Sequence, residues 1–360
     1  MHKFSLNRIN LSLLIPSLLL VFIGLSVFYS IDTAIFKQQL FMLFISIIGY
    51  LIFLNINFRI FTMYGKYIYV IILVLLSVLL LVGTEVRGAV RWMEVLGIRL
   101  QLAEVIKPFF IIVFAQFLSR SEDKSFTKFI QSLLLLLPIL LLTIKQPDLG
   151  NGIIYFVVGV YMLFTYRFPL WYFLFLALML IIPIPVFFEF MHGYQKERIL
   201  SFLNTSSDPF GSSYNAIQSL ISIGSGGIFG KGLGQATQSV LKFLPERHTD
   251  FIFASVSESL GIIGSLLILL LFGYFLYTVH KILEEVDDLF CYLFISGFYM
   301  LILIHVFFNV GMNIGILPIV GITLPFVSYG GSSLLTHFIV LGILSSVSYE
   351  FKRKESVEIR

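Results

Sequence analysis

The chain has 360 residues, of which 58% are hydrophobic, 16% aromatic and only 12% charged, whereas soluble proteins carry about 25% charged residues. This composition excludes a soluble globular domain, and a formal net charge of +4 is too small to indicate a nucleic-acid partner. Its single cysteine, Cys291, lies in an apolar stretch, so the chain can form neither an internal disulfide nor a cysteine metal cluster.

Apolar stretches of roughly 20 residues, the length that crosses a bilayer, recur along the whole sequence. Only helices and closed barrels satisfy the backbone in lipid, and runs of Leu, Ile and Phe without strict alternation favour helices. The sequence therefore predicts an all-α polytopic membrane protein with one domain, residues 1–360. The ten predicted spans are 11–31, 39–56, 67–83, 102–119, 130–146, 151–167, 170–190, 250–280, 289–310 and 333–351.

The first span follows Lys3 and Arg8 and could be mistaken for a secretory signal. It is too long for one and no small-residue cleavage site follows, so we expect an uncleaved span. With both termini in the cytoplasm, thirteen of the 24 Lys and Arg residues lie inside, ten lie outside and Lys107 lies within a span. Five of the ten outside cations fall in the long segment 191–249, and long loops cross regardless of their charge.

The large extracytoplasmic loop 191–249 separates the seventh and eighth spans. It contains a glycine-rich run at 224–234, which predicts a flexible loop at the lipid interface, and it ends directly before Asp250. A carboxylate at the lip of a span is costly to desolvate and indicates function. The structural alternative is that Asp250 caps the eighth helix, because Asp is a favoured N-cap.

Two further ionisable residues, Glu104 and Lys107, lie near the outer end of the fourth span. Their i, i+3 spacing places them on one helix face. Ionisable groups in an apolar span normally face a cavity or each other. The pair is therefore either part of a substrate site or only a structural ion pair.

Three other outside segments are candidates for the site. Arg87 and Arg91 flank the start of one loop, 145–150 forms a Pro-Asp turn, and 321–333 is rich in Gly, Ser and Pro at membrane depth. Irregular backbone is tolerated there only where it is buried in protein or lines a cavity. Outside arginines indicate an anionic ligand, because Arg binds phosphate with two hydrogen bonds, and surface solvation is the alternative.

Several familiar catalytic motifs are absent from the sequence. The glycine-rich run has Ser225 at the first glycine position of a P-loop and Gly232 at the Ser/Thr position, and it contains no GxGxxG. The chain has no HExxH or GxSxG, and its six histidines are scattered along the sequence. Nucleotide-driven and serine-hydrolase chemistry are therefore disfavoured.

Taken together, the motifs resemble those of the SEDS family of cell-wall polymerases, the RodA/FtsW/SpoVE group, over nearly the whole chain. They are Arg87–Trp92, Glu104–Pro108, Gln146–Gly150, Gln218-Ser219, Gly224–Gly227, Gly230–Gly232, Leu244–Phe253 and Pro325–Ser333. Within the family, the chain looks more like RodA, the elongation member, than FtsW, the division member. The features that indicate this are Lys145-Gln146, the run Pro245–His248 and the short termini. The sequence departs from the family pattern at Leu102-Ala103, where Pro-Ser is usual, and at Ser259, where a second acid is usual, which puts a role for a second carboxylate in doubt.

The resemblance implies a peptidoglycan glycosyltransferase of the bacterial cytoplasmic membrane that polymerises lipid II on the outer face. It also implies a class B penicillin-binding protein as transpeptidase partner, together with membrane proteins of the elongation complex, membrane lipid and no nucleic acid. The alternatives are a flippase for the same precursor, an FtsW-like division polymerase, or a scaffold that only recruits the transpeptidase. A flippase needs a charged path through the membrane, whereas the charged motifs here gather on one predicted side.

For an inverting displacement, one base must deprotonate the acceptor hydroxyl, and the diphosphate leaving group needs cations rather than a general acid, unlike glycosidases with paired carboxylates. We therefore predict Asp250 as the catalytic base. A divalent cation, Mg²⁺ or Mn²⁺, is a further candidate for holding diphosphate, but no site for it can be read from the sequence. The predicted substrate-binding residues are Glu104, Lys107, Arg87, Arg91, Arg198, Gln218, Lys231 and Ser328.

Overall fold

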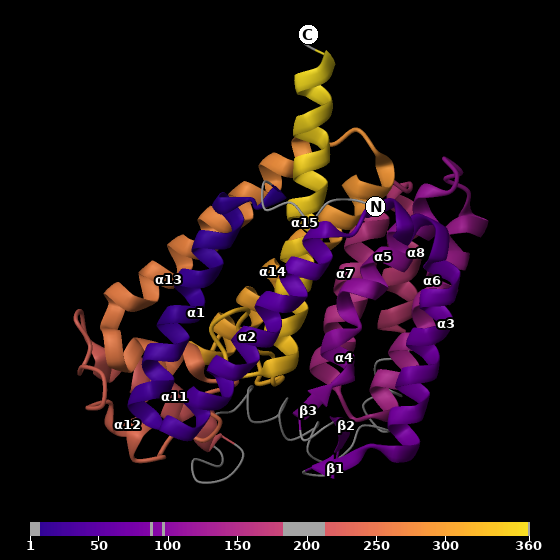
Figure 1. The fold of residues 1–360 in the computed structure, drawn as a ribbon. Coiled ribbons are helices and arrows are strands. Elements are labelled where there is room, and N and C mark those ends of the chain that lie inside the picture. The colour runs from indigo at the N-terminus through magenta and orange to yellow at the C-terminus, as the bar shows by residue number, and fades with distance from the viewer. Residues whose placement is uncertain (1–7, 87–88, 96–97, 183–212, 359–360) are drawn as a thin grey trace.

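The computed structural model describes residues 8–86, 89–95, 98–182 and 213–358 (Figure 1). Ten long helices, counted among these residues with the short α4 joined to α5, account for the predicted spans. They are α1 (Leu11–Ile31), α2 (Thr33–Asn55), α3 (Arg59–Val82), α4 (Leu102–Val105) with α5 (Lys107–Ser119), α6 (Phe126–Lys145), α7 (Leu149–Thr165), α8 (Leu170–Ile181), α13 (Ile252–Glu284), α14 (Leu289–Asn313) and α15 (Gly331–Glu358). Two shorter helices, α11 (Tyr214–Gly226) and α12 (Thr237–Val240), precede α13.

Eight of the helices within the described part of the chain are long and apolar enough to cross a membrane. The other two, α7 and α8, are shorter apolar helices. The protein is therefore a multi-pass membrane protein, and the predicted all-α class with about ten spans is confirmed. The predicted seventh span continues beyond Ile182 into residues outside the described ones.

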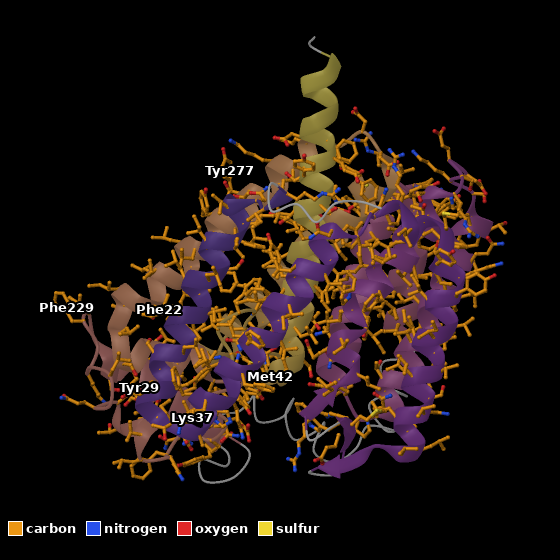
Figure 2. All side chains as sticks on the ribbon, viewed as in Figure 1. Phe22, Tyr29, Lys37, Met42, Phe229 and Tyr277 are labelled. Carbon is orange, nitrogen blue, oxygen red and sulfur yellow. The ribbon has the colours of Figure 1, made fainter. Side chains whose placement is uncertain are left out.

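The start of α1 and the end of α15 lie on the same side of the bundle, and α11, α12 and the strands lie on the opposite side (Figure 1). A chain that crosses the membrane an even number of times has its two ends on the same side. Large apolar side chains such as Phe22 and Phe229 point outward at the periphery, where they are 68% and 80% exposed (Figure 2). In a bilayer this apolar surface faces lipid tails, so its exposure costs nothing there.

Inside the bundle, α15 packs along α2, α1 packs along α13, and α14 contacts α5, α7 and α13. Aromatic side chains such as Phe110, Phe298 and Phe338 are fully buried between these helices. Because α14 contacts helices from both halves of the chain, polar side chains on its buried face can connect segments that are far apart in sequence.

Several boundaries differ from the predicted ones. Helices α2 and α3 begin at Thr33 and Arg59, six and eight residues before the predicted starts. Lys37 and Lys66 were assigned to loops because of their charge, but long cationic side chains at a helix end can reach the membrane surface. The fourth span is interrupted at Ile106, where α4 ends and α5 begins with Lys107-Pro108. Proline fits this first turn because its missing N–H would have no helical partner there.

A three-stranded antiparallel sheet, which the sequence did not predict, precedes α4. Its strands, in the order β1-β2-β3, are β1 (Thr84–Val86), β2 (Ala89–Val95) and β3 (Ile98–Gln101). Trp92 of β2 pairs with Gln101 of β3. The sheet therefore fixes the direction in which the chain passes from Gln101 into α4 and, through it, the position of Glu104.

The glycine-rich run packs tightly against α13, so the predicted flexible loop is wrong for this segment. Gly261 interrupts α13 with φ of 70°. Around the break, the N–H groups of Ile262 and Ile263 donate to carbonyls of 227 and 228, while Lys231 N and Gly232 N donate to Glu258 O and Ser259 O. Backbone groups left without helical partners are thereby paired by a neighbouring segment, as the membrane interior requires.

We expect Gly261→Ala to lower the melting temperature of the purified protein by several degrees. A Cβ at Gly261 would lie 2.4 Å from both Gly230 N and Ile228 O, and the positive φ alone costs about 1–3 kcal/mol for a residue with a side chain. Gly273→Ala in the same helix is the matched control, because nothing lies within 4 Å of the point that a Cβ at Gly273 would occupy. Equal melting temperatures for the two variants would contradict this account of the break.

Candidate functional site

Asp250 lies in the turn directly before α13, where it is half-buried. The N-cap of α13 is Phe251, not Asp250, so the structural alternative considered for this carboxylate does not describe its position. The carboxylate lies over the turn at Gly321, since a Cβ built there would be 3.4 Å from Asp250 Oδ2. Gly321 has φ of 73°, a conformation that favours glycine.

The segment after α14 braces the residues before Asp250. Ser328 is buried, and its hydroxyl donates to Thr249 O at 2.7 Å and accepts from Leu324 N at 2.8 Å. Tyr329 N donates to His248 O at 2.8 Å. Ser328, which the sequence predicts to bind substrate, thus lies next to the turn that carries Asp250. In this structure its hydroxyl holds the backbone of that turn.

Arg247 adds a cation beside this turn. Its side chain is only 8% exposed. Burial lowers the pKa of the Arg247 guanidinium, while the carboxylates of Asp32 and Glu246 raise it. Arginine stays protonated in proteins, so a positive group lies three residues before the proposed base.

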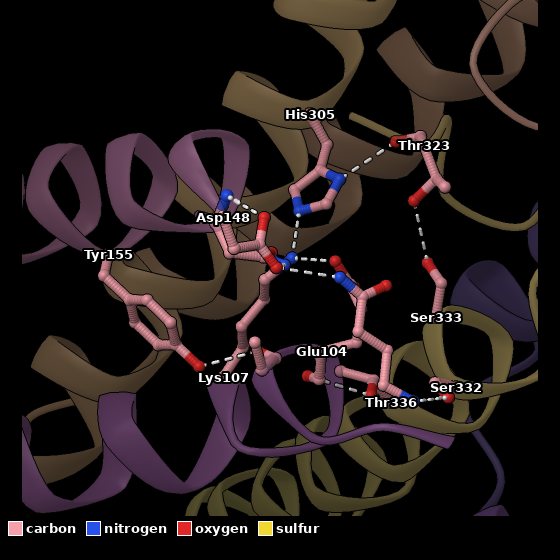
Figure 3. Close-up of polar contacts among 12 residues, drawn as sticks. Glu104, Lys107, Asp148, Tyr155, His305, Thr323, Ser332, Ser333 and Thr336 are labelled. Atoms are coloured by element: carbon pink, nitrogen blue, oxygen red, sulfur yellow. Dashed lines mark hydrogen bonds and ion pairs between the residues drawn. The ribbon is translucent and has the colours of Figure 1, made fainter. Parts of the chain in front are cut away.

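Glu104 and Lys107 form the ion pair that their spacing predicts. Lys107 Nζ lies 2.6 Å from Glu104 Oε1 and 3.0 Å from His305 Nε2, and the lysine is 1% exposed (Figure 3). Since a protonated amine has only donors, His305 Nε2 accepts and His305 Nδ1 donates to Thr323 O at 3.0 Å. The burial favours the structural ion pair over direct contact of Lys107 with substrate in this conformation.

Asp148 lies beside this pair and is hydrogen-bonded to Gln101, the last residue of β3 (Figure 3). Gln101 Nε2 donates to Asp148 Oδ2 at 2.9 Å, and Asn151 Nδ2 donates to the same oxygen at 2.8 Å. Arg91, which is half-buried in β2, donates to Pro147 O. The structure therefore brings Arg91, the 147–150 turn, Glu104 and Lys107 into one cluster, as the one-sided arrangement of the motifs predicts.

Lys231 and Gln218 lie closer to α13 than to this cluster. Lys231 Nζ is paired with Glu258 Oε1 at 3.0 Å, and the Glu258 side chain is fully buried. Glu258 also accepts from Gln238 N and Ser239 N, so it holds the segment around α12. Gln218 is half-buried on α11, which packs against α13. The predicted Arg87 and Arg198 lie outside the described residues.

Three polar residues on α14 were missed by the sequence analysis: His305, Asn309 and Asn313. They follow one another at i, i+4 and i+8 and are fully buried. Asn309 Nδ2 contacts Asp250 O at 2.9 Å, and Asn313 Nδ2 contacts it at 3.0 Å. Their spacing in an apolar span was a readable signal, because it places all three on one helix face.

No group of three His, Cys, Asp or Glu residues that could hold a metal ion is found within the described ranges. One buried acceptor in the cluster, Glu104 Oε2, has no hydrogen-bond partner there. A single orphaned carboxylate oxygen does not define a Mg²⁺ or Mn²⁺ site, which needs several oxygen ligands. The divalent cation remains a prediction, and no step proposed below depends on it.

A family model described as a cell cycle protein, which groups FtsW, RodA and SpoVE, matches residues 5–353. The chain belongs to this family. It is 35% identical over 345 residues to the peptidoglycan glycosyltransferase MrdB of Escherichia coli, covering 92% of each chain. It is 36% identical over 362 residues to the stage V sporulation protein E of Bacillus subtilis, covering 94% of this chain and 96% of that one.

Solved structures agree with this assignment. A chain of a peptidoglycan synthase complex superposes with a TM-score of 0.82 at 29% identity and covers 95% of this chain and 98% of that chain. The rod shape determining protein RodA of Thermus thermophilus superposes with a TM-score of 0.73 at 25% identity, covering 95% and 97%. The resemblance to the RodA/FtsW/SpoVE family is therefore confirmed at the level of sequence and of fold.

Proposed function

We propose that this chain is a peptidoglycan glycosyltransferase that polymerises lipid II on the outer face of the cytoplasmic membrane during cell elongation and shape maintenance. Relatives named as peptidoglycan glycosyltransferases support the enzyme class. The observation that carries the proposal is the position of Asp250 at the membrane lip. Its half-buried carboxylate lies beside the 321–330 segment, and its backbone carbonyl contacts the buried polar face of α14. A scaffold without chemistry would not need a carboxylate in this setting.

In the proposed reaction, Asp250 accepts the proton of the acceptor sugar 4-hydroxyl as its oxygen attacks the anomeric carbon of the donor. The bond from that carbon to the lipid diphosphate breaks, and the diphosphate leaves with the bonding electron pair. One displacement inverts the anomeric carbon, so one carboxylate suffices. Positioned base catalysis of this kind contributes roughly 10²–10⁴ in rate.

Cations rather than an acid stabilise a departing diphosphate. Among the residues that the structure describes, Arg91 is a candidate for binding the diphosphate. Arg87 and Arg198, which lie outside the described residues, are further candidates. Lys107 is too buried to reach a ligand in this conformation, and we propose that it holds Glu104 and His305 in place. The lipid tails lie in grooves between the apolar helices in this scheme.

The assembly and topology belong to the same proposal. The likeness to a chain of a peptidoglycan synthase complex supports a class B penicillin-binding protein as partner, alongside elongation-complex membrane proteins. Both termini are cytoplasmic and the loop 191–249 is extracytoplasmic in the proposed orientation. The positions of α1, α15, α11 and α12 in Figure 1 agree with that orientation.

A flippase for the same precursor would need polar groups along a path to the inner side. Lys128, a buried cation at the inner end, donates instead to Leu118 O at 2.8 Å and Ser121 O at 2.6 Å and to the Tyr166 hydroxyl. These contacts fasten the loop between α5 and α6. Lys128 thus has a structural role, which favours polymerisation over transport.

We expect the purified chain, mixed with its transpeptidase partner and lipid II in detergent micelles, to form glycan strands that are resolved on a denaturing gel. Micelles have no two compartments, so transport alone cannot produce strands. Transport is measured separately, by reconstituting the same protein into vesicles that contain fluorescent lipid II and following its movement from one leaflet to the other. Translocation in vesicles without strands in micelles would replace the proposed enzyme with a transporter.

A further inference from the structure

The first turn of α13 is hydrogen-bonded to another helix, α14. Phe251, the N-cap, makes no side-chain capping bond. Ala254, in the first turn, has an N–H that helical bonding leaves without a partner, and it donates to Asn313 Oδ1 of α14 at 3.0 Å. The position at which α13 begins is therefore set by α14.

Asn309 connects the same start to the segment beneath the Asp250 carboxylate. Its Nδ2 group donates to Asp250 O at 2.9 Å and to Ile322 O at 2.8 Å. A side-chain amide has two hydrogens on this nitrogen, and these two carbonyls match them. Because Ile322 follows Gly321, whose turn lies under Asp250 Oδ2, one amide joins the backbone of the proposed base to the surface against which its carboxylate rests.

His305 extends this line one turn further along α14. Its ring links Lys107 Nζ to Thr323 O, the carbonyl next to the one that Asn309 holds. The turn at 321–323 is thus held at two adjacent carbonyls by two residues of the same helix face. Asn313 Nδ2 also donates to Asn309 O at 2.7 Å, which stiffens that face.

We propose that Asn309 is a positioning residue of the reaction. Its two hydrogen bonds set the distance and direction between the Asp250 carboxylate and the 321–323 turn, with Asn313 and His305 fixing the two ends of the same face. Asn309 does not touch substrate, so its contribution is to hold the base in a productive geometry, where small displacements are costly to rate. The inference rests on the proposed function of Asp250 as base.

The test compares Asn309→Leu and Asn309→Ser with Gln116→Leu. Gln116 is also a buried amide that donates to a backbone carbonyl, that of Thr62, but it lies near the inner end of α5. Each leucine variant removes a buried side-chain amide together with the hydrogen bonds it donates to backbone carbonyls, so both are expected to lose stability through the same kind of change. Asn309→Ser is the milder variant, because serine keeps one donor and leaves room for water.

We expect both Asn309 variants to lower kcat for lipid II polymerisation at least 10-fold, with KM changed less than 3-fold, at a temperature where they are fully folded. Gln116→Leu should keep both constants within 3-fold of the starting protein. A loss in the Asn309 variants that matches Gln116→Leu, or a rise in KM at constant kcat, overturns the proposal.

Hydrogen exchange separates this inference from the proposed function. Amides of residues 249–254 and 321–324 should exchange at least 10-fold faster in Asn309→Leu than in the unmodified protein, while the amides of α13 after its break, residues 262–284, should be unchanged. If the unmodified protein forms no strands but this local change is observed, the function fails and the positioning role stands. Unchanged exchange in these two segments, whatever the activity, means that Asn309 does not hold them together.

Discussion

Replacing Asp250 with asparagine is expected to reduce lipid II polymerisation by roughly 10²–10⁴, the range that a positioned general base contributes. The amide has nearly the same shape, so contacts with the Gly321 turn are kept, and the backbone carbonyl still accepts from Asn309 and Asn313. The loss should therefore fall on kcat and not on folding. Strand formation on gels and thermal denaturation of the same sample measure the two quantities.

Asp288→Asn is the matched control for this substitution. Asp288 caps α14 by accepting from Cys291 N at 2.9 Å, and asparagine caps a helix about as well as aspartate. The control removes a carboxylate near the other end of the long helices and should keep full activity. Wild-type strand formation by Asp250→Asn would exclude a carboxylate base at this position.

Much of the architecture follows from the sequence because the bilayer imposes one length and one backbone solution. The apolar runs predict the spans, and the i, i+3 spacing of Glu104 and Lys107 correctly predicts their contact. The starts of α2 and α3 were misplaced for a related reason. The charged residues Lys37 and Lys66 were assigned to the loops before the second and third spans, although both lie within the helices α2 and α3.

The parts that the sequence did not predict depend on which segments meet in space. The run that contains Gly226 and Gly230 was interpreted as a flexible loop, and Gly261 was not singled out, whereas a Cβ at any of these three positions would overlap backbone of a neighbouring segment. Local pattern cannot distinguish a glycine needed for conformation from one needed for close approach. Likewise, Asn309 and Asn313 share a readable face, but only the packing of α14 against α13 shows that they hold the backbone of Asp250.

The second large effect is expected at Lys107. Lys107→Met should destabilise the protein by about 3–5 kcal/mol, the usual cost of removing one partner from a buried ion pair. Glu104 would keep a buried charge, and Glu104 Oε2 already has no hydrogen-bond partner within the described residues. Denaturation of the purified variant measures this loss, which should accompany a loss of polymerisation.

A double variant separates stability from catalysis at this pair. Glu104→Gln combined with Lys107→Met removes both charges, and replacing a buried ion pair as a unit is often close to neutral for stability. We expect the double variant to regain most of the folding stability lost in Lys107→Met. Activity should remain at least 10-fold reduced, because His305 Nε2 loses its donor and no longer connects α5 to Thr323.

These outcomes distinguish three roles for the lysine. Recovery of both stability and activity in the double variant would mean that the pair is purely structural. A raised KM for lipid II in a well-folded double variant would indicate that Lys107 reaches the diphosphate in another conformation. A lowered kcat at unchanged KM matches the role given to it here, since an ion pair that fixes His305 acts on the geometry around Asp250 and not on substrate affinity.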